Sequence, residues 1–310
     1  MLHRLRHLHG HAIVRIAIVG NPAAGRGRGE QVLERLAVAR VAKRVQIEKT
    51  RAAGDEEEIA RALIRDGVES IVAVGGDGTC SKIARAILTE VRRCNLAVIP
   101  CGTGNDFAKM LGVALLSPEQ VLALVERGSL AGVDVGRVGP DYFLNSCGFG
   151  FDPSVLAATK RMRILKGNAV YIVSAVAQLF SYRGIDISID PQGETSARRM
   201  LMLTVSNGRF LGGAFRIAPD ASVLDGVLDV GLFADSGLIG RIRMFAGALR
   251  GTHLDIPSVS SARVRSIIVR SPKAPMLEVD GELRQAESPT VKIECVPRAL
   301  NAIVAPGFPL

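Results

Sequence analysis

From Arg15 to about Gly128, the chain alternates short apolar runs with segments in which apolar residues recur at helical spacing. RIAIVG, SIVAVGG and NLAVIPCG are nearly continuous in apolar character, and a glycine-containing segment and a helix-like pattern follow each of them. Such runs are typical of strands buried on both faces of a parallel sheet. One predicted helix has Ser117 as its N-cap, Gln120 at the third helical position and Gly128 after its last turn. The pattern predicts a layered α/β domain.

After Gly128 the spacing changes to short runs in which apolar and polar residues alternate. The runs are GIDISID, RRMLMLTVSNG, VLDVGLF, ARVRSIIVR, PMLEVDGEL and TVKIECV. This spacing favours an antiparallel sandwich or barrel-like sheet, interrupted by helical segments at 153–182 and 236–249. The predicted domains are an α/β domain over residues 12–128, a β-rich domain over residues 129–297, and a tail, 298–310, that returns to the first domain.

Composition indicates the class of partner. The 310 residues are 48% hydrophobic, as in a globular protein, and their net charge of +9 favours a nucleotide, a nucleic acid or an acidic membrane surface. The aromatic content of 4% argues against a stacking platform for single-stranded nucleic acid, so we predict no nucleic-acid partner. Five cysteines without a CxxC pair fit reduced thiols in the cytoplasm better than disulfides or a zinc site.

The hydrophobic pattern predicts neither a secretory signal nor a membrane span. The longest uncharged stretch, 167–182, is shorter than the roughly 20 apolar residues that a span requires. We therefore expect a cytoplasmic protein whose membrane contact is peripheral, at the inner membrane surface. The basic segment KRMRILKG, 160–167, is either a contact for anionic headgroups or a solvated helix face. A homodimer is compatible with the sequence.

Three glycine-rich loops follow predicted strands of the first domain: 20–29, 75–79 and 100–108. Because ligands of open α/β sheets bind beyond the carboxyl ends of the strands, we expect these loops to share one ligand site. The first loop, GNPAAGRGRG, is not a Walker A loop, because Arg26 and Gly27 stand where Lys and Ser or Thr are required. It is either a flexible surface loop or a phosphate cradle to which arginines add charge.

The second and third loops add carboxylates to this edge of the sheet. In GGDGT the glycines permit a phosphate to approach the backbone, and Asp77 is placed to hold Mg²⁺. In PCGTGNDFA, Thr103 and Asn105 offer hydrogen bonds and Asp106 supplies a second carboxylate. The alternatives are an ordinary turn at Asp77 and a simple helix cap at Asp106. Taken together, the loops favour a site for a metal ion and a polyphosphate.

The chain resembles the catalytic domain of the diacylglycerol kinase and sphingosine kinase superfamily, in particular its bacterial soluble lipid kinases. The resemblance is carried by NPAAG, GGDGT, PCGTGNDFA, GVDVGRV, YFLNSCGFGFD, VSNGRFLGGAFRIAPDASVLDGVLDV and EVDGEL, which together extend over nearly the whole chain. It implies a Rossmann-like domain of the NAD kinase and phosphofructokinase type followed by an antiparallel β-sandwich domain. The active site would lie in the cleft between the two.

The resemblance also implies roles for individual residues. Asp77 and Asp106 would belong to the charged cluster around the phosphates and Mg²⁺, and Asp280 or Glu282 would be the general base, with the choice between them left open. Asp225 would bind a structural or regulatory metal ion. The residues implied in ATP binding are Asn21, Pro22, Gly25, Arg26, Thr50, Gly75, Gly76, Asp77, Gly78, Thr79 and Thr103. The positions that would assist Asp225 through their backbone carbonyls are Ser222 and Val227.

The chain departs from the family pattern in two places. Ala24 stands where serine is usual, and Ser81 and Lys82 stand where an Asn-Glu pair is frequent. These departures would affect either how tightly the nucleotide binds or which nucleotide binds. Asp225 and Asp280 each precede a glycine, so taken without the resemblance they are also compatible with hairpin turns.

The sequence therefore predicts an ATP-dependent, Mg²⁺-dependent lipid kinase. It would transfer the γ-phosphate to a primary hydroxyl of a lipid such as diacylglycerol, with a carboxylate as general base. Only His253 lies outside the N-terminal tail, so a histidine-dependent nucleophilic mechanism is not favoured. The alternatives are an NAD kinase-like phosphotransferase and a non-catalytic regulator that binds nucleotides or lipids.

Overall fold

In the computed structural model, the first part of the chain folds around a parallel sheet. The structure describes residues 15–38, 45–52, 54–161, 177–190 and 198–309. The sheet has the strand order β2-β1-β3-β4, and its strands are β1 (Ile16–Gly20), β2 (Val45–Lys49), β3 (Ser70–Gly75) and β4 (Asn95–Pro100). In register, Gly20 lies beside Val74, and Gly75 lies beside Pro100. The three strands β1, β3 and β4 thus end level with one another.

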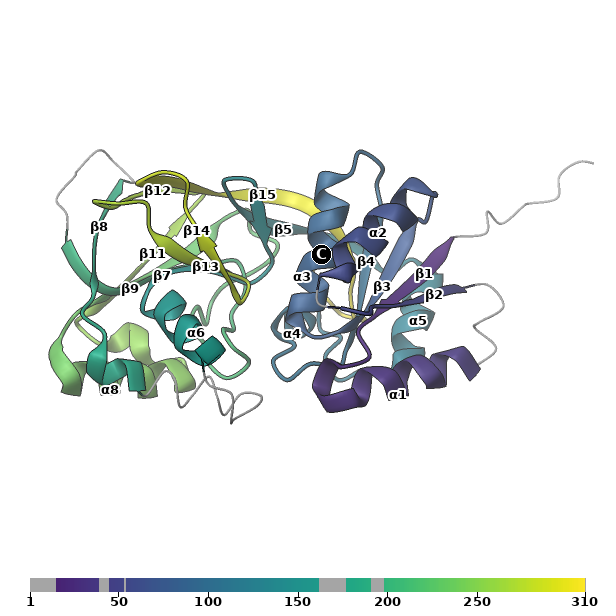
Figure 1. Cartoon of the computed structure of the whole chain (residues 1–310), viewed down its shortest axis with the longest axis horizontal. Helices are drawn as coiled ribbons and strands as arrows, with labels where there is room; N and C mark the ends of the chain where they lie inside the picture. The colour runs from purple at the N-terminus through teal and green to yellow at the C-terminus, as the bar shows by residue number, and fades with distance from the viewer. Residues whose placement is uncertain (1–14, 39–44, 53, 162–176, 191–197, 310) are drawn as a thin grey trace, which may run out of the picture.

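Helices cover both faces of this sheet (Figure 1). The helices on one face are α1 (Ala24–Val38) and α5 (Pro118–Arg127), and those on the other are α2 (Asp55–Arg65) and α3 (Asp77–Thr89). The short helix α4 (Asp106–Met110) follows β4. The capping box predicted for α5 is present, because Ser117 Oγ accepts from the Gln120 N–H and the Gln120 side chain accepts from the Ser117 N–H. The predicted α/β domain is confirmed.

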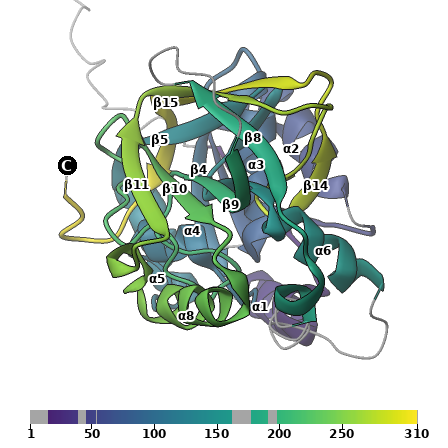
Figure 2. The same ribbon diagram turned by 90° about the vertical axis from the view of Figure 1, so that its left-hand side faces the viewer.

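The second part of the chain is built of antiparallel strands (Figures 1 and 2). Its strands are β5 (Leu130–Val138), β6 (Asp141–Phe143), β7 (Ser146–Gly150), β8 (Ile185–Asp190), β9 (Arg198–Ser206), β10 (Leu228–Ala234), β11 (Val259–Val264), β12 (Ser266–Arg270), β13 (Met276–Val279), β14 (Glu282–Gln285) and β15 (Thr290–Ile303). Its described helical residues include α6 (Phe151–Arg161), the stretch 177–181, α8 (Gly237–Arg250) and a 3₁₀ turn (His253–Asp255). The predicted antiparallel β-rich part is confirmed. α8 matches the predicted helical segment 236–249, and α6 overlaps the predicted segment 153–182, of which 162–176 lies outside the described residues.

Two separate apolar clusters form the core of this part. One lies between the strands and includes Phe143, Phe149 and Val269, all buried. The other packs beneath α6 and α8 and includes Val155 and Met244. His253 belongs to this second region: its ring is fully buried, stacks on Phe233 and contacts the Ile217 carbonyl.

The last strand, β15, connects the two parts of the chain. It pairs antiparallel with β12 and β5 and then lies parallel to β4, where Ala302 is the partner of Leu96. Between Val296 and Leu300 its register with β5 shifts, and Arg298 there has a φ of 50°. The run ALNAIVAP therefore does reach the first sheet, while the domain limits at 128/129 and 297/298 stay a prediction.

Candidate active site

The three glycine-rich loops meet at one edge of the parallel sheet. The backbone N–H of Asn21 donates to the Val74 carbonyl over 2.9 Å, which joins the first loop to β3. The N–H groups of Cys101 and Gly102 both donate to the Gly75 carbonyl, over 2.7 and 3.2 Å, which joins the third loop to the second. The structure therefore brings together the loops that the sequence pattern placed at a common edge.

Close packing between these loops accounts for part of their glycine content. A Cβ atom at Gly102 would lie 2.5 Å from the Cα of Gly76, and one at Gly25 would lie 1.9 Å from the carbonyl oxygen of Cys101. At Gly78 and Gly27, in contrast, a Cβ atom would meet no atom within 4 Å. The idea that glycine lets a phosphate reach the backbone is thus best suited to Gly78 and Gly27, because Gly25 and Gly102 are needed for contact between loops.

The other residues predicted to bind a nucleotide surround the same edge. Arg26 has a left-handed φ of 62° between two left-handed glycines at the start of α1. The Asn21 amide donates to Glu56 over 3.2 Å, and the Thr50 N–H donates to the Gly20 carbonyl over 2.9 Å. Thr103 is exposed. Their positions are compatible with one ligand, and contact with a nucleotide stays a prediction.

A pocket of about 160 Å³ opens beside these loops and is lined by carboxyl groups from both parts of the chain. The carboxyl groups belong to Asp77, Asp106, Asp152, Glu278 and Asp280. We call this cavity the carboxylate pocket. Its remaining walls include Asn145, Ser146, Leu156 and the segment 210–212. The two loop carboxylates predicted to act together therefore do share one cavity.

Contacts with the backbone fix the orientation of the two loop carboxylates. Asp77 accepts a hydrogen bond from the Phe107 N–H over 3.2 Å. Asp106 binds Lys109 over 2.8 Å through one oxygen and accepts from the Gly213 N–H over 2.8 Å through the other. Since Gly213 lies in the second part of the chain, Asp106 connects the two parts. Asp77 is therefore more than a turn residue.

Negative charge in the carboxylate pocket is only partly compensated. Burial raises the pKa of Asp77 to about 6, and the charge of Asp106 adds to this effect. Burial also raises the pKa of Glu278 well above its ordinary value, with a further contribution from Asp152. A group of carboxylates with raised pKa values in a cavity is typical of a site that binds a cation or transfers a proton.

The donors of this pocket suit Mg²⁺, which prefers carboxylate oxygens and usually binds through one or two of them together with substrate phosphates. Asp77 and Asp106 are the two carboxylates that adjoin the glycine-rich loops. Among the residues that the structure describes, no three acidic, histidine or cysteine side chains are already arranged to hold a metal ion. The pocket therefore fits a metal ion that would take some of its ligands from these carboxylates and the others from a bound phosphate.

The segment DGE places its two carboxylates in different surroundings. Asp280 lies in the carboxylate pocket and accepts from three consecutive backbone N–H groups, with distances of 2.7 Å from Leu144, 2.8 Å from Asn145 and 3.2 Å from Ser146. The Ser81 hydroxyl of α3 also donates to Asp280, over 2.9 Å. Burial raises the pKa of Asp280, although these hydrogen bonds oppose the shift. Asp280 therefore anchors the segment across the two parts of the chain.

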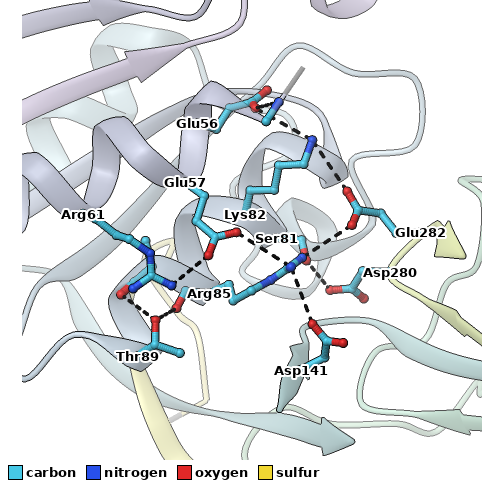
Figure 3. A network of polar contacts seen from close by, with 12 residues as sticks. Glu56, Glu57, Arg61, Ser81, Lys82, Arg85, Thr89, Asp141, Asp280 and Glu282 are labelled. Carbon is cyan, nitrogen blue, oxygen red and sulfur yellow. Dashed lines mark hydrogen bonds and ion pairs between the residues drawn. The ribbon is translucent and has the colours of Figure 1, made fainter. Parts of the chain in front are cut away.

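Glu282 does not line the carboxylate pocket and instead faces basic side chains (Figure 3). Lys82 and Arg85 of α3 each approach it to 3.6 Å, and Arg284 of its own strand binds it as well. Burial alone would raise the pKa of Glu282, but the charges of Arg284, Lys82 and Arg85 outweigh it and hold the pKa below its usual range.

The basic residues of α3 continue this network toward α2 and β6 (Figure 3). Lys82 lies 3.8 Å from Glu56, and Arg85 lies 3.7 Å from Glu57 and 3.5 Å from Asp141. The members of this group, which we call the α3 cluster, are Glu56, Glu57, Lys82, Arg85, Asp141, Glu282 and Arg284. The departures at Ser81 and Lys82 thus contact Asp280 and Glu282 from across the chain.

Several members of the carboxylate pocket and of the α3 cluster were not predicted from the sequence. Glu278 was part of an alternating strand pattern; it lies in β13, and Asp280, which lines the same pocket, stands in the turn that directly follows this strand. Asp152 follows the run SCGFGF, and its carboxylate lies 2.7 Å from where a Cβ atom of Gly148 would be. Because Glu278 is the cross-strand partner of Gly148, the glycine leaves room for Asp152 beside Glu278.

The predicted metal position at Asp225 lies apart from the carboxylate pocket. One oxygen of Asp225 pairs with Arg263, and the other accepts from the Val227 N–H over 3.2 Å. Ser222 accepts from the Leu224 N–H over 3.3 Å. A metal ion at Asp225 would compete with Arg263, and metal binding there stays a prediction.

Two other sequence features concern the membrane. None of the described helices is long and apolar enough to cross a membrane. The side chains of the basic segment 160–167 lie outside the described residues.

Comparisons with known proteins agree with this architecture. The family model for the diacylglycerol kinase catalytic domain matches residues 15–138. The model for the YegS C-terminal NAD kinase beta sandwich-like domain matches residues 145–304. A crystal structure of a diacylglycerol kinase from Bacillus anthracis str. Sterne superposes with a TM-score of 0.71 at 20% sequence identity, covering 96% of this chain and 98% of that chain, which shows a shared fold.

Two relatives extend the comparison over most of the sequence. A protein of Pseudomonas putida named "Probable lipid kinase YegS-like" is 30% identical over 268 residues, which cover 86% of this chain and 87% of the relative. A "Diacylglycerol kinase" of Bacillus subtilis is 28% identical over 273 residues, which cover 86% of this chain and 89% of the relative. The chain therefore belongs to the diacylglycerol kinase catalytic-domain family of enzymes, in the group whose second domain is of the YegS C-terminal type.

Proposed function

We propose that the protein is an ATP-dependent lipid kinase that transfers the γ-phosphate to a primary hydroxyl of a membrane lipid such as diacylglycerol. The observation that carries the proposal is the contact between a polar and an apolar cavity. The carboxylate pocket shares Asp152 and Leu211 with a narrow apolar cavity of about 50 Å³. The walls of the apolar cavity include Phe151, Leu201, Met202, Phe215, Phe233 and Met244.

This pair of cavities suits an amphipathic acceptor. A hydroxyl-bearing headgroup would occupy the carboxylate pocket, while the beginning of an acyl chain would enter the apolar cavity. The names of the relatives, lipid kinase and diacylglycerol kinase, support the same class of acceptor. A soluble nucleotide acceptor has no acyl chain that could fill the apolar cavity.

The phosphate donor would lie over the three glycine-rich loops. Gly27 and Gly78 leave backbone open toward the ligand, and Arg26 adds positive charge. Asp77 and Asp106 would hold Mg²⁺, which supplies charge neutralisation on the phosphates. Phosphoryl transfer depends mainly on such positioning and charge compensation, so these loops would provide most of the catalytic effect.

A carboxylate of the DGE segment would take the proton of the attacking hydroxyl. Asp280 lines the carboxylate pocket but accepts four hydrogen bonds, whereas Glu282 stays ionised beside its basic neighbours. General-base assistance of this kind contributes about 10²–10⁴-fold. Asp225 would hold a second, structural metal ion with backbone carbonyls near Ser222 and Val227.

The test is transfer of labelled γ-phosphate from ATP to a panel of lipids in mixed micelles with Mg²⁺, with NAD as a further acceptor. The variants are Asp77→Asn, Asp280→Asn and Glu282→Gln, each checked for a native circular dichroism spectrum. We expect a labelled lipid that disappears with Asp77→Asn. Because Asp280 also anchors the DGE segment, a loss with Asp280→Asn identifies it as the base only if Glu282→Gln keeps wild-type activity. Labelled NAD in place of labelled lipid, or ATP binding without any transfer, would overturn the proposal.

A further inference from the structure

The outward face of α8 is apolar and basic, without acidic residues. Within the helix, GLIGRIRMFAGALR, the three charged residues are all arginines. Large apolar side chains nevertheless point to solvent, and Ile239 is 78% exposed. The other exposed apolar residues of the helix are Leu238, Ile242 and Leu249. The exposed arginines among them are Arg243 and Arg250.

The apolar surface extends from α8 to a neighbouring segment. Phe180, which is 65% exposed, and Leu238 line a common groove together with Arg199. Arg241 in this groove pairs with Asp235 over 2.8 Å and donates to the Leu179 carbonyl over 2.8 Å, so the groove's acidic residue is already neutralised. We call this surface the α8 face; its members are Phe180, Arg199, Leu238, Ile239, Ile242, Arg243, Leu249 and Arg250.

The inner side of the same helix forms a wall of the apolar cavity. Met244, Phe245 and Ala248 line that cavity, which adjoins the carboxylate pocket at the shared wall residues Asp152 and Leu211. The helix lies along the outer edge of the second domain (Figures 1 and 2). A surface that approached α8 from outside would thus be separated from the cavity by this single helix.

We propose that the α8 face docks on an anionic lipid membrane, with its apolar side chains in the headgroup layer and its arginines on the lipid phosphates. The occupant follows from charge and shape: an amphipathic helix with exposed isoleucine and leucine, basic residues and no acid is suited to lie in the plane of an anionic interface. This assignment rests on the proposed function only in that a lipid acceptor would then enter the cavity directly behind α8.

Vesicle sedimentation tests the surface without any catalytic step. The probes are vesicles of phosphatidylcholine alone and vesicles with one third phosphatidylglycerol. The two test variants are the pair Ile239→Gln with Ile242→Gln and the pair Arg243→Gln with Arg250→Gln. The matched controls are Val91→Gln with Leu115→Gln, which are 102% and 98% exposed on the first domain, and Arg93→Gln with Arg127→Gln, which are exposed there as well.

We expect wild-type protein to bind the anionic vesicles more tightly than the neutral ones. Each test pair should weaken binding to anionic vesicles about tenfold or more. Each basic residue near such a surface contributes on the order of a fivefold change, and each isoleucine buried in the interface contributes at least a comparable amount. The controls should bind like wild type. Equal binding of all variants, or an equal loss with the controls, would overturn the proposal.

Activity measurements separate this inference from the proposed function. With a short-chain acceptor dissolved as monomers, the α8 variants should keep wild-type kcat, and they should lose activity only on acceptors embedded in anionic vesicles. If the wild type phosphorylates no lipid while the vesicle binding falls as expected, the proposed function fails and the docking surface stands. If activity on both acceptors and vesicle binding are unchanged by the substitutions, the docking surface fails alone.

Discussion

Asp280 and Glu282 are separated by a single glycine, yet they enter two regions of opposite electrostatic character. The carboxylate pocket gathers four further carboxyl groups around Asp280, and burial raises the pKa values of Asp77 and Glu278. In the α3 cluster, Lys82, Arg85 and Arg284 surround Glu282 and hold its pKa low. In the first region, burial and mutual repulsion of the carboxylates favour a bound cation, whereas in the second the acidic side chains are already paired with basic ones. The pocket is therefore the better candidate for a cation site, while Glu282 keeps the ionised form that a general base requires.

The largest effect is expected at the carboxylates that would hold the Mg²⁺ ion bound to the phosphates. Asp77→Asn should lower kcat by about 10²–10³-fold or more, because it removes a proposed metal ligand from a buried site. Stability should change little or rise, since a buried carboxylate is replaced by a neutral amide. Initial rates with labelled ATP and urea unfolding measure the two effects. Asp66→Asn, an exposed change, is the control, and equal rates for both variants would contradict the proposed role.

The next largest effect on kcat/KM is expected when one of the basic side chains around Glu282 is removed. Lys82→Gln removes one of the cations that stabilise the ionised form, so the pKa of Glu282 should rise. If Glu282 is the base, the acidic limb of the kcat/KM profile moves to higher pH, with a loss on the order of tenfold at about pH 5 and little at about pH 8.

Lys49→Gln is the matched control for Lys82→Gln, because Lys49 also pairs with a glutamate, Glu30, over 2.7 Å, but on the exposed edge of the first domain. An acidic limb that stays in place with Lys82→Gln would show that Glu282 is not the group that titrates.

A smaller effect concerns stability and the pocket residue Glu278. Its pKa is raised in the folded protein, so the protonated form is favoured there, whereas in the unfolded chain it ionises near the ordinary value of 4.5. The stability present below that value is lost as the pH rises toward the folded pKa. Glu278→Gln should therefore unfold at higher urea than wild type at about pH 8, by about 1–2 kcal/mol, and the difference should shrink at about pH 5. A difference independent of pH would be inconsistent with a protonated Glu278.

The smallest effect is expected at Asp225, whose pair with Arg263 is partly exposed. Asp225→Asn should lower the free energy of unfolding by less than about 1 kcal/mol without divalent cations. If a metal ion binds there, Mg²⁺ should raise the melting temperature of the wild type more than that of the variant. Identical Mg²⁺ responses would argue against the predicted metal site.

Local sequence patterns were sufficient for the glycine-rich loops but not for their partners. Asp77 and Asp106 could be placed together because parallel strands end at one edge, a rule that needs no knowledge of side-chain packing. Asp152 fits beside Glu278 only because Gly148 of β7, the cross-strand partner of Glu278, has no side chain. That pairing depends on the strand register. Glu56 was part of the acidic first turn of α2, where the helix dipole alone explains an acid. Its contacts with Asn21 and Lys82 come from the tertiary fold.

The basic segment and the α8 face illustrate the same limit. The positive charge of 160–167 indicates a contact with anionic headgroups. In contrast, Ile239 and Ile242 fit a helical pattern that ordinarily indicates a buried side of a helix. Whether an apolar helical residue points inward depends on which side of the helix packs on the strands. Sequence periodicity shows that a helix has an apolar side, but it does not show whether that side packs on the strands or faces solvent.

The path of β15 has a consequence for how the protein is made. Its final residues complete the sheet of the first domain beside β4, although that domain's other strands emerge from the ribosome much earlier. The nascent first domain must therefore wait, with one edge of β4 unpaired, until the end of β15 has been synthesised. A truncation that removed Leu300–Ile303 would leave that edge open and expose it to aggregation.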